Sequence, residues 1–122
     1  MNTSEVQIEQ RGQLAVLTYD APMLTNLEAD RLIAALRQYR EQTGCVHFVI
    51  QMDGVDFIDS ACIGSLVTFL IEIDKLGGRL ILSGCQRTVA ELMSITGLTT
   101  HIPLVCSVEQ AVQEYGNGSR TE

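Results

Sequence analysis

The stretch "VDFIDSACIGSL", residues 55–66, places an acid and a hydroxyl, Asp59 and Ser60, between two apolar segments. The segment before it, residues 46–52, is almost continuously apolar, which is typical of a strand buried in the centre of a sheet. The segment that starts at Ser60 carries apolar residues at helical intervals as far as Leu76, and glycines follow it. The stretch therefore predicts a strand-to-helix connection with Asp59 and Ser60 at the start of the helix.

Strand and helix patterns alternate along the rest of the chain. Residues 11–13 separate the first two strand-like runs by the spacing of a hairpin, and helical segments separate the later strands, which indicates parallel crossover connections. We therefore expect one α/β domain over residues 1–122, with a core at about residues 6–115 and a flexible tail at residues 116–122. Its architecture should be a mixed sheet of about four to five strands with about four helices packed on it. The expected strands are residues 6–10, 14–19, 46–52, 79–84 and 101–105, and the expected helices are residues 25–42, 60–76, 87–96 and 107–115.

The composition argues against nucleic acid and membrane as partners. Asp and Glu number 15 against 8 Lys and Arg, which gives a net charge of −7, and the basic residues are scattered. The first residues, "MNTSEVQIEQ", lack a basic region followed by an apolar block, so no secretory signal is expected. The apolar stretch from Ala61 to Leu76 is interrupted by polar residues and is too short for membrane insertion. We expect a cytoplasmic protein.

The cysteines and aromatic residues favour structural roles. No CxxC motif and no nearby pair of histidines is present, so neither a zinc site nor a cofactor is expected. His47 lies in a strand-like run and His101 in another apolar segment, and both are interpreted as structural. The residues expected in the core include the four reduced cysteines, Cys45, Cys62, Cys85 and Cys106, and the phenylalanines Phe48, Phe57 and Phe69.

Catalysis by Ser60 has little support. A serine nucleophile needs a general base within hydrogen-bond reach and donors for the oxyanion, but the sequence has no GxSxG elbow, and neither histidine has a recognisable catalytic context. Phosphate-binding loops of the Walker or GxGxxG type are also missing. We therefore expect no catalytic residues and a protein that is not an enzyme. A helix N-cap at Asp59 or Ser60, worth about 1 kcal/mol, is the simplest structural role.

Four short sequence blocks follow one another along the chain: "FIDSACIG", "LGGRLILSG", "VAELMSITGL" and "SVEQAV". Together they cover the chain from about residue 6 to residue 115, and the chain resembles the STAS domain of bacterial anti-sigma factor antagonists. The resemblance implies that Ser60 is the serine phosphorylated by a partner kinase. It also implies a partner-binding surface at the start of the helix, formed by Ile58, Asp59, Ser60, Ala61, Cys62, Ile63 and Gly64.

Two positions depart from the pattern of that family. Cys62 stands where the motif has glycine, which puts a side chain at a place where the backbone is usually bare. Upstream, aligning "LTNLEADRL" with the start of the first helix puts Thr25 where many antagonists have an acid near the serine. Thr25 also suits a helix N-cap.

The resemblance implies a partner and a switch. The partner is an anti-sigma factor with serine kinase activity; the unmodified chain would bind it through Ser60 and flanking apolar residues such as Ile58 and Ile63, and so release a sigma factor. Phosphorylation of Ser60 would end binding, and a serine phosphatase would reverse it. The Cys62 and Thr25 departures leave a second hypothesis open, a STAS scaffold or accessory subunit of a stress-signalling or transport complex that is not phosphorylated.

Overall fold

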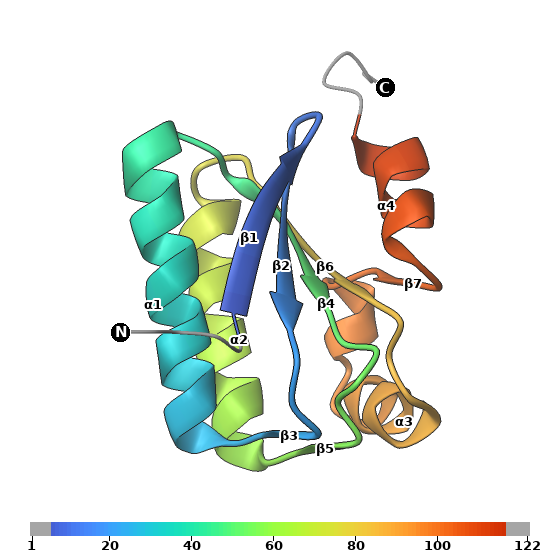
Figure 1. Ribbon diagram of the computed structural model, residues 1–122. Helices are drawn as coiled ribbons and strands as arrows, with labels where there is room; N and C mark the ends of the chain where they lie inside the picture. Colours follow the sequence, from blue (N-terminus) through green and yellow to red (C-terminus); the bar gives the residue numbers. More distant parts are fainter. Residues whose placement is uncertain (1–5, 117–122) are drawn as a thin grey trace.

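Five strands form the main sheet in the order β1-β2-β4-β6-β7, and helices cover both of its faces (Figure 1). The computed structural model describes residues 6–116. The tail expected at residues 116–122 lies, except for Gly116, outside the described residues. The elements are β1 Val6–Arg11, β2 Leu14–Tyr19, β3 Met23–Leu24, α1 Asn26–Thr43, β4 His47–Gln51, β5 Phe57–Ile58, α2 Ser60–Asp74, β6 Arg79–Ser83, α3 Arg87–Ile95, β7 Leu104–Val105 and α4 Val108–Tyr115.

The mixed sheet confirms the α/β fold class expected from the alternating patterns. β1 and β2 pair antiparallel as a hairpin, whereas β2, β4, β6 and β7 are parallel neighbours. β4 is the central strand, in agreement with its nearly continuous apolar sequence. Helix α1 ends where Gly44 adopts the left-handed conformation with φ 79°, which costs glycine little.

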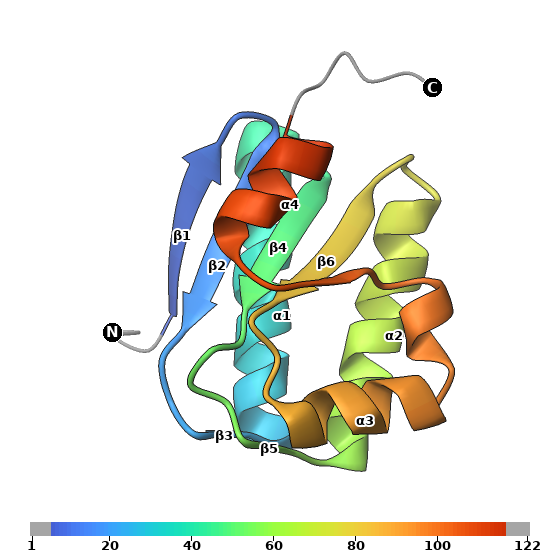
Figure 2. The same ribbon diagram turned by 90° about the vertical axis from the view of Figure 1, so that its right-hand side faces the viewer.

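Alternating side chains of the strands build two apolar cores. On one face of the sheet, Phe48 and Ile50 of β4 point toward α1 and α2, and the ring of Phe48 meets that of Phe69 from α2 edge to face. On the other face, Val49 packs with residues of α4 in a smaller cluster. The view in Figure 2 shows α4 in front of the sheet and α1 and α2 behind it. The two cores hold the sheet rigid between the helices.

A second, two-stranded sheet was not expected from the sequence. β3 and β5 pair in parallel at the end of the molecule where the chain leaves β2 and β4, at the bottom of Figure 1. The register joins Met23 to Phe57 and Leu24 to Ile58. This small sheet precedes α1 and α2 directly, so it determines where both helices begin.

Candidate functional site

The N-termini of α1 and α2 lie side by side because β3 and β5 are parallel and in register. Leu24 and Ile58 are paired in the small sheet, and the next residues along the chain, Thr25 and Asp59, are the N-caps of α1 and α2. A hydrogen bond from the Ser65 hydroxyl to Asp30 Oδ1 (3.2 Å) joins the helices further along. The structure thus brings together two segments that the sequence separates.

Asp59 caps α2 with its side chain. Its Oδ1 accepts a hydrogen bond from the backbone amide of Cys62 at 2.9 Å, and its carbonyl oxygen accepts one from the amide of Ile63. The amides of Ser60 and Ala61 are therefore the first-turn donors that the helix itself leaves unsatisfied. Both residues are exposed, as is Gly64 one turn further along. The structure presents the Ser60 hydroxyl to solvent beside free amide groups.

Cys62 does not obstruct this surface. The side chain is fully buried (0% exposed), in a row with Leu66, Phe69 and Ile73 on the core side of α2. Burial, and secondarily the charge of Asp59, raises the pKa of the Cys62 thiol to about 12. The expectation that Cys62 lies on the partner-binding surface is therefore wrong, because the helix turns its third residue into the core.

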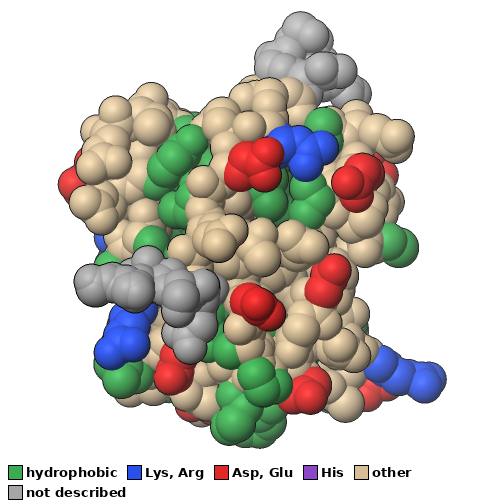
Figure 3. All heavy atoms as spheres, in the orientation of Figure 1, with side chains coloured by type: hydrophobic (Ala, Val, Ile, Leu, Met, Phe, Trp, Pro, Cys, Tyr) green, Lys and Arg blue, Asp and Glu red, His purple; other side chains and the backbone are tan. Residues whose placement is uncertain are grey.

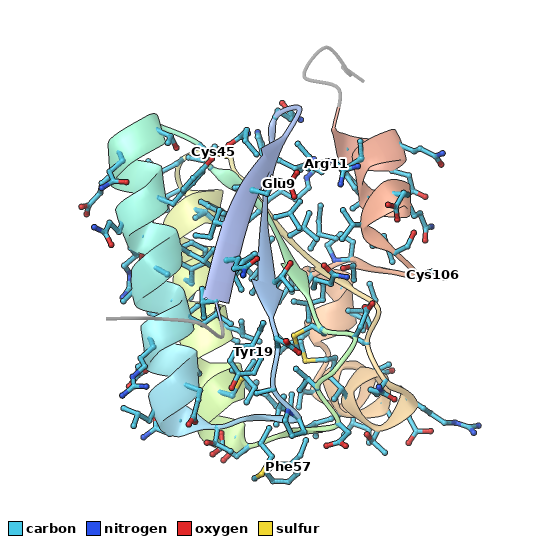
Figure 4. The ribbon with its side chains drawn as sticks, viewed as in Figure 1. Glu9, Arg11, Tyr19, Cys45, Phe57 and Cys106 are labelled. Carbon is cyan, nitrogen blue, oxygen red and sulfur yellow. The ribbon has the colours of Figure 1, made fainter. Side chains whose placement is uncertain are left out.

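The apolar residues around Ser60 are also arranged differently from the expectation. Ile58 is only 4% exposed, because alternation along β5 points it into the core, so it adds little to the exposed surface around Ser60. Phe57, expected in the core, is instead 48% exposed, and Figure 4 shows it projecting from the lower end of the molecule. Ile63 is half-buried. Phe57 and its strand partner Met23, 51% exposed, supply the apolar surface that sequence reasoning assigned to Ile58.

Thr25 occupies the N-cap position of α1 without capping it by its side chain. Its hydroxyl instead donates a hydrogen bond to Glu28 Oε1 at 2.6 Å. This bond is the main reason why the pKa of Glu28 lies below its ordinary value. At the position where the resemblance implies an acid in many antagonists, this chain carries a hydroxyl that is already bound to a carboxylate.

An interhelical ion pair fixes α1 against α2 beyond the site. The Arg37 guanidinium binds both carboxylate oxygens of Glu72, and Arg40 binds one of them at 3.3 Å. The hydrogen bonds from Arg37, together with Arg40, hold the pKa of Glu72 below its ordinary value. These contacts join the C-terminal halves of the two helices, several turns away from Ser60.

The other reactive side chains lie away from Ser60. Cys62 is buried in the main core, and Cys45 and Cys85 are partly buried and pack against it. Cys106, just after β7, is exposed, so the expectation of four core cysteines is wrong for Cys106 (Figure 4). His47 lies at the start of β4, and burial lowers its pKa. Within residues 6–116, no group of three or more His, Cys, Asp and Glu side chains is placed to hold a metal ion. Over the same residues, no helix has both the length and the apolar character needed to span a bilayer.

The site is thus built to present a hydroxyl and to tolerate an anion. The start of a helix carries partial positive charge and free amide donors, which favour a phosphate at its first residue. An exposed hydroxyl in this position is accessible to a modifying enzyme. Among the described residues, no side-chain hydrogen bond joins Ser60 to a histidine.

Comparison with known proteins places this geometry in a family. The family model of the STAS domain matches residues 5–111. A putative anti-sigma factor antagonist from Thermotoga maritima superposes with a TM-score of 0.81 at 18% identity, covering 89% of this chain and 92% of that chain. The Bacillus cell fate determinant SpoIIAA in its phosphorylated form gives a TM-score of 0.70 at 18% identity over 89% and 97% of the two chains. A sulfate transporter family protein from Wolinella succinogenes superposes with a TM-score of 0.70 at 19% identity, covering 93% of this chain and 91% of that chain.

At these identities the solved structures establish the shared fold and leave the partner open. The match of the family model extends over β1 to α4 and includes Asp59, Ser60 and the helix they begin. The order of the main-sheet strands and of the helices expected from the alternating sequence patterns agrees with the structure. This protein belongs to the STAS domain family.

Proposed function

We propose that this protein is an anti-sigma factor antagonist controlled by phosphorylation of Ser60. In its unmodified form it binds an anti-sigma factor with serine kinase activity and so releases a sigma factor. The kinase transfers the γ-phosphate of ATP to Ser60 Oγ, ADP leaves, and the modified protein dissociates until a serine phosphatase removes the phosphate. Because the exchange uses ATP, we place it in the cytoplasm. The observation that carries the proposal is the exposed Ser60 hydroxyl at the N-terminus of α2.

The fold should tolerate the phosphate. Phosphorylation adds a charge of about −1.5 to −2 and three acceptor oxygens. At the first residue of α2 these oxygens would lie close to the free amides of Ser60 and Ala61 and to the positive end of the helix dipole. The first turn of α2 carries no acidic residue, so the N-cap Asp59 is the nearest like charge along the chain.

The same phosphate should prevent docking. In the centre of an interface it would lose its hydration and lie beside the Asp59 carboxylate, at a cost of several kcal/mol. We expect the affinity for the partner to fall roughly a thousandfold, which corresponds to about 4 kcal/mol. One modification would therefore separate a binding state from a non-binding state without unfolding the domain.

A second candidate function is a STAS accessory domain that is not phosphorylated. Two observations favour it: Thr25 replaces the acid expected near the serine, and the structural neighbours include a sulfate transporter family protein. In that case the N-terminus of α2 would serve as a constitutive contact surface. Ser60 would then carry no phosphate under any condition.

The two functions are distinguished by phosphorylation of the purified protein. Each candidate anti-sigma factor kinase of the source genome is incubated with the protein and ATP, and the intact mass is measured. We expect one phosphate on the wild type and on Ser65→Ala, a matched control one turn further along α2, and none on Ser60→Ala. Absence of phosphate from the wild type with every such kinase, or equal phosphorylation of Ser60→Ala, contradicts the proposal.

A further inference from the structure

A short apolar groove separates β5 from α3 at the same end of the molecule as Ser60. Ile58 and Val89, both nearly buried, line its inner part, while Phe57, Leu92 and Ile95 form its outer walls. It encloses about 290 Å³, at or below the size of ordinary small-molecule sites, and it is open to solvent, which suits a few apolar side chains of another protein. α3 and β5, whose residues line this groove, lie at the lower edge of the molecule in Figure 2.

The walls of this groove are unusually exposed. Ile95 is 81% exposed and Phe57 48%, and Met23 lies beside Phe57 because the two residues are paired in the small sheet. Figure 3 shows hydrophobic side chains gathered at the lower end, where β3 and β5 lie in Figure 1. Single exposed apolar residues are common on protein surfaces, but neighbouring ones on either side of a groove mark an interaction site.

The charges around the groove favour a partner with basic residues. Two acids, Asp56 and Glu91, line the groove. Glu91 forms an ion pair with the exposed Arg87 at 3.4 Å. The chain as a whole carries a net charge of −7. A second copy would therefore bring acids against acids, whereas a partner with basic residues around an apolar centre would be attracted.

The C-terminal residues do not have the side chains that an apolar groove binds. In Figure 1, α4 lies at the end of the molecule opposite to β3 and β5, and residues 117–122 contain no apolar side chain. β5, the strand that borders the groove, has only two residues, too few for an added strand to pair with. The form that fits beside α3 is a helix.

We propose that the groove binds an amphipathic helix of the anti-sigma factor, with apolar residues one turn apart and Lys or Arg on both sides. This inference rests on the proposed function, which makes the anti-sigma factor the partner. Phe57 precedes Ser60 by three residues, so a helix in the groove covers the surface next to the Ser60 hydroxyl. The groove supplies the apolar anchor, and Ser60 supplies the part of the contact that phosphorylation changes.

The first test compares two exposed apolar residues that end helices. Ile95 is the last residue of α3 and Leu76, 56% exposed, follows the far end of α2, so Ile95→Glu and Leu76→Glu make the same charge change at similar sites. Dissociation constants for the kinase that binds the wild type are measured by calorimetry. We expect Ile95→Glu to weaken binding at least tenfold and Leu76→Glu by less than threefold, with both variants folded by circular dichroism. Equal affinity of Ile95→Glu and the wild type overturns the groove and leaves the Ser60 switch standing.

The second test does not need the kinase. If no kinase binds the wild type, the proposed function is rejected, and this test alone decides whether the groove binds a helix. A synthetic amphipathic helical peptide with leucines one turn apart and flanking lysines is titrated into the labelled protein, and amide shifts are followed by NMR. We expect saturable shifts at Phe57, Leu92 and Ile95, and none with the same peptide carrying glutamates for lysines. Amide shifts at other residues, or equal shifts with both peptides, overturn the inference. A dimer of the wild type that Ile95→Glu dissociates also overturns it.

Discussion

The Asp59 carboxylate accepts a hydrogen bond from the backbone amide of Cys62 at 2.9 Å, and this contact caps the start of α2 at the turn where the Cys62 thiol lies in the core. Because the cap satisfies the third amide of the helix, the amides of Ser60 and Ala61 remain free at the tip. The arrangement of the site therefore depends on Asp59 as much as on Ser60.

Asp59→Ala should lower the free energy of unfolding by about 1 kcal/mol, the usual cost of a lost side-chain N-cap. Asp59→Asn keeps an acceptor oxygen for the Cys62 amide and should change stability by only a few tenths of a kcal/mol. Urea unfolding followed by circular dichroism measures both. If the alanine variant is as stable as the wild type, or the asparagine variant loses as much as the alanine variant, the side chain does not act as the cap.

The cysteines should differ widely in reactivity. Only the thiolate reacts with alkylating reagents, and burial with a pKa of about 12 keeps Cys62 protonated and inaccessible in the folded protein. Burial also raises the pKa of Cys85, to about 11, whereas Cys106 is exposed. Iodoacetamide at about pH 8, followed by peptide mass spectrometry, should label Cys106 first and Cys62 only after unfolding in urea. Labelling of Cys62 at the rate of Cys106 in the folded protein would show that α2 does not turn it inward.

Much of the fold is predictable because long elements carry local patterns. The helical spacing of apolar residues predicts α1 within a residue or two of its bounds Asn26–Thr43, and Gly44 predicts its end. β3 and β5 could not be predicted in the same way, because two residues carry no period and their pairing joins distant parts of the chain. The position of the site depends on that non-local pairing.

The candidate site was predictable in part. A helix that buries Leu66, Phe69 and Ile73 also buries the residue four before Leu66, so the spacing alone contained the signal that Cys62 faces the core. The exposure of Phe57 had no such signal, because its size and hydrophobicity favour the core and only the alternation along β5 turns it outward. Sequence patterns thus locate Ser60 but leave the surrounding surface to the tertiary structure.

The pair of Arg37 with Glu72 should stabilise the protein in a pH-dependent way. The pKa of Glu72 is lowered from its ordinary value of 4.5 in the folded state, so its contribution is present above pH 4.5 and is lost as the pH falls through the lowered value. Because both side chains are about one-third exposed, we expect Glu72→Gln to cost no more than about 1 kcal/mol at pH 7.

Urea unfolding of the wild type and Glu72→Gln at several pH values tests this contribution. The difference between them should shrink as the pH falls below 4.5. A difference that grows toward low pH would contradict the assigned role of the ion pair.

Ser60→Asp should leave the fold intact. An acid in the first turn of a helix interacts favourably with the helix dipole, by about 0.3 to 1 kcal/mol, so the variant should be at least as stable as Ser60→Ala in thermal unfolding. Partner binding should be weak for Ser60→Asp and retained for Ser60→Ala. A marked loss of stability in Ser60→Asp would mean that the helix tip does not accept an anion.

The most direct measurement of the switch compares the affinities of the unmodified and the fully Ser60-phosphorylated protein for the same anti-sigma factor, with the free energy of unfolding of both forms determined in parallel. The account predicts roughly a thousandfold weaker binding of the phosphorylated form with unchanged stability. Equal affinities of the two folded forms would contradict it.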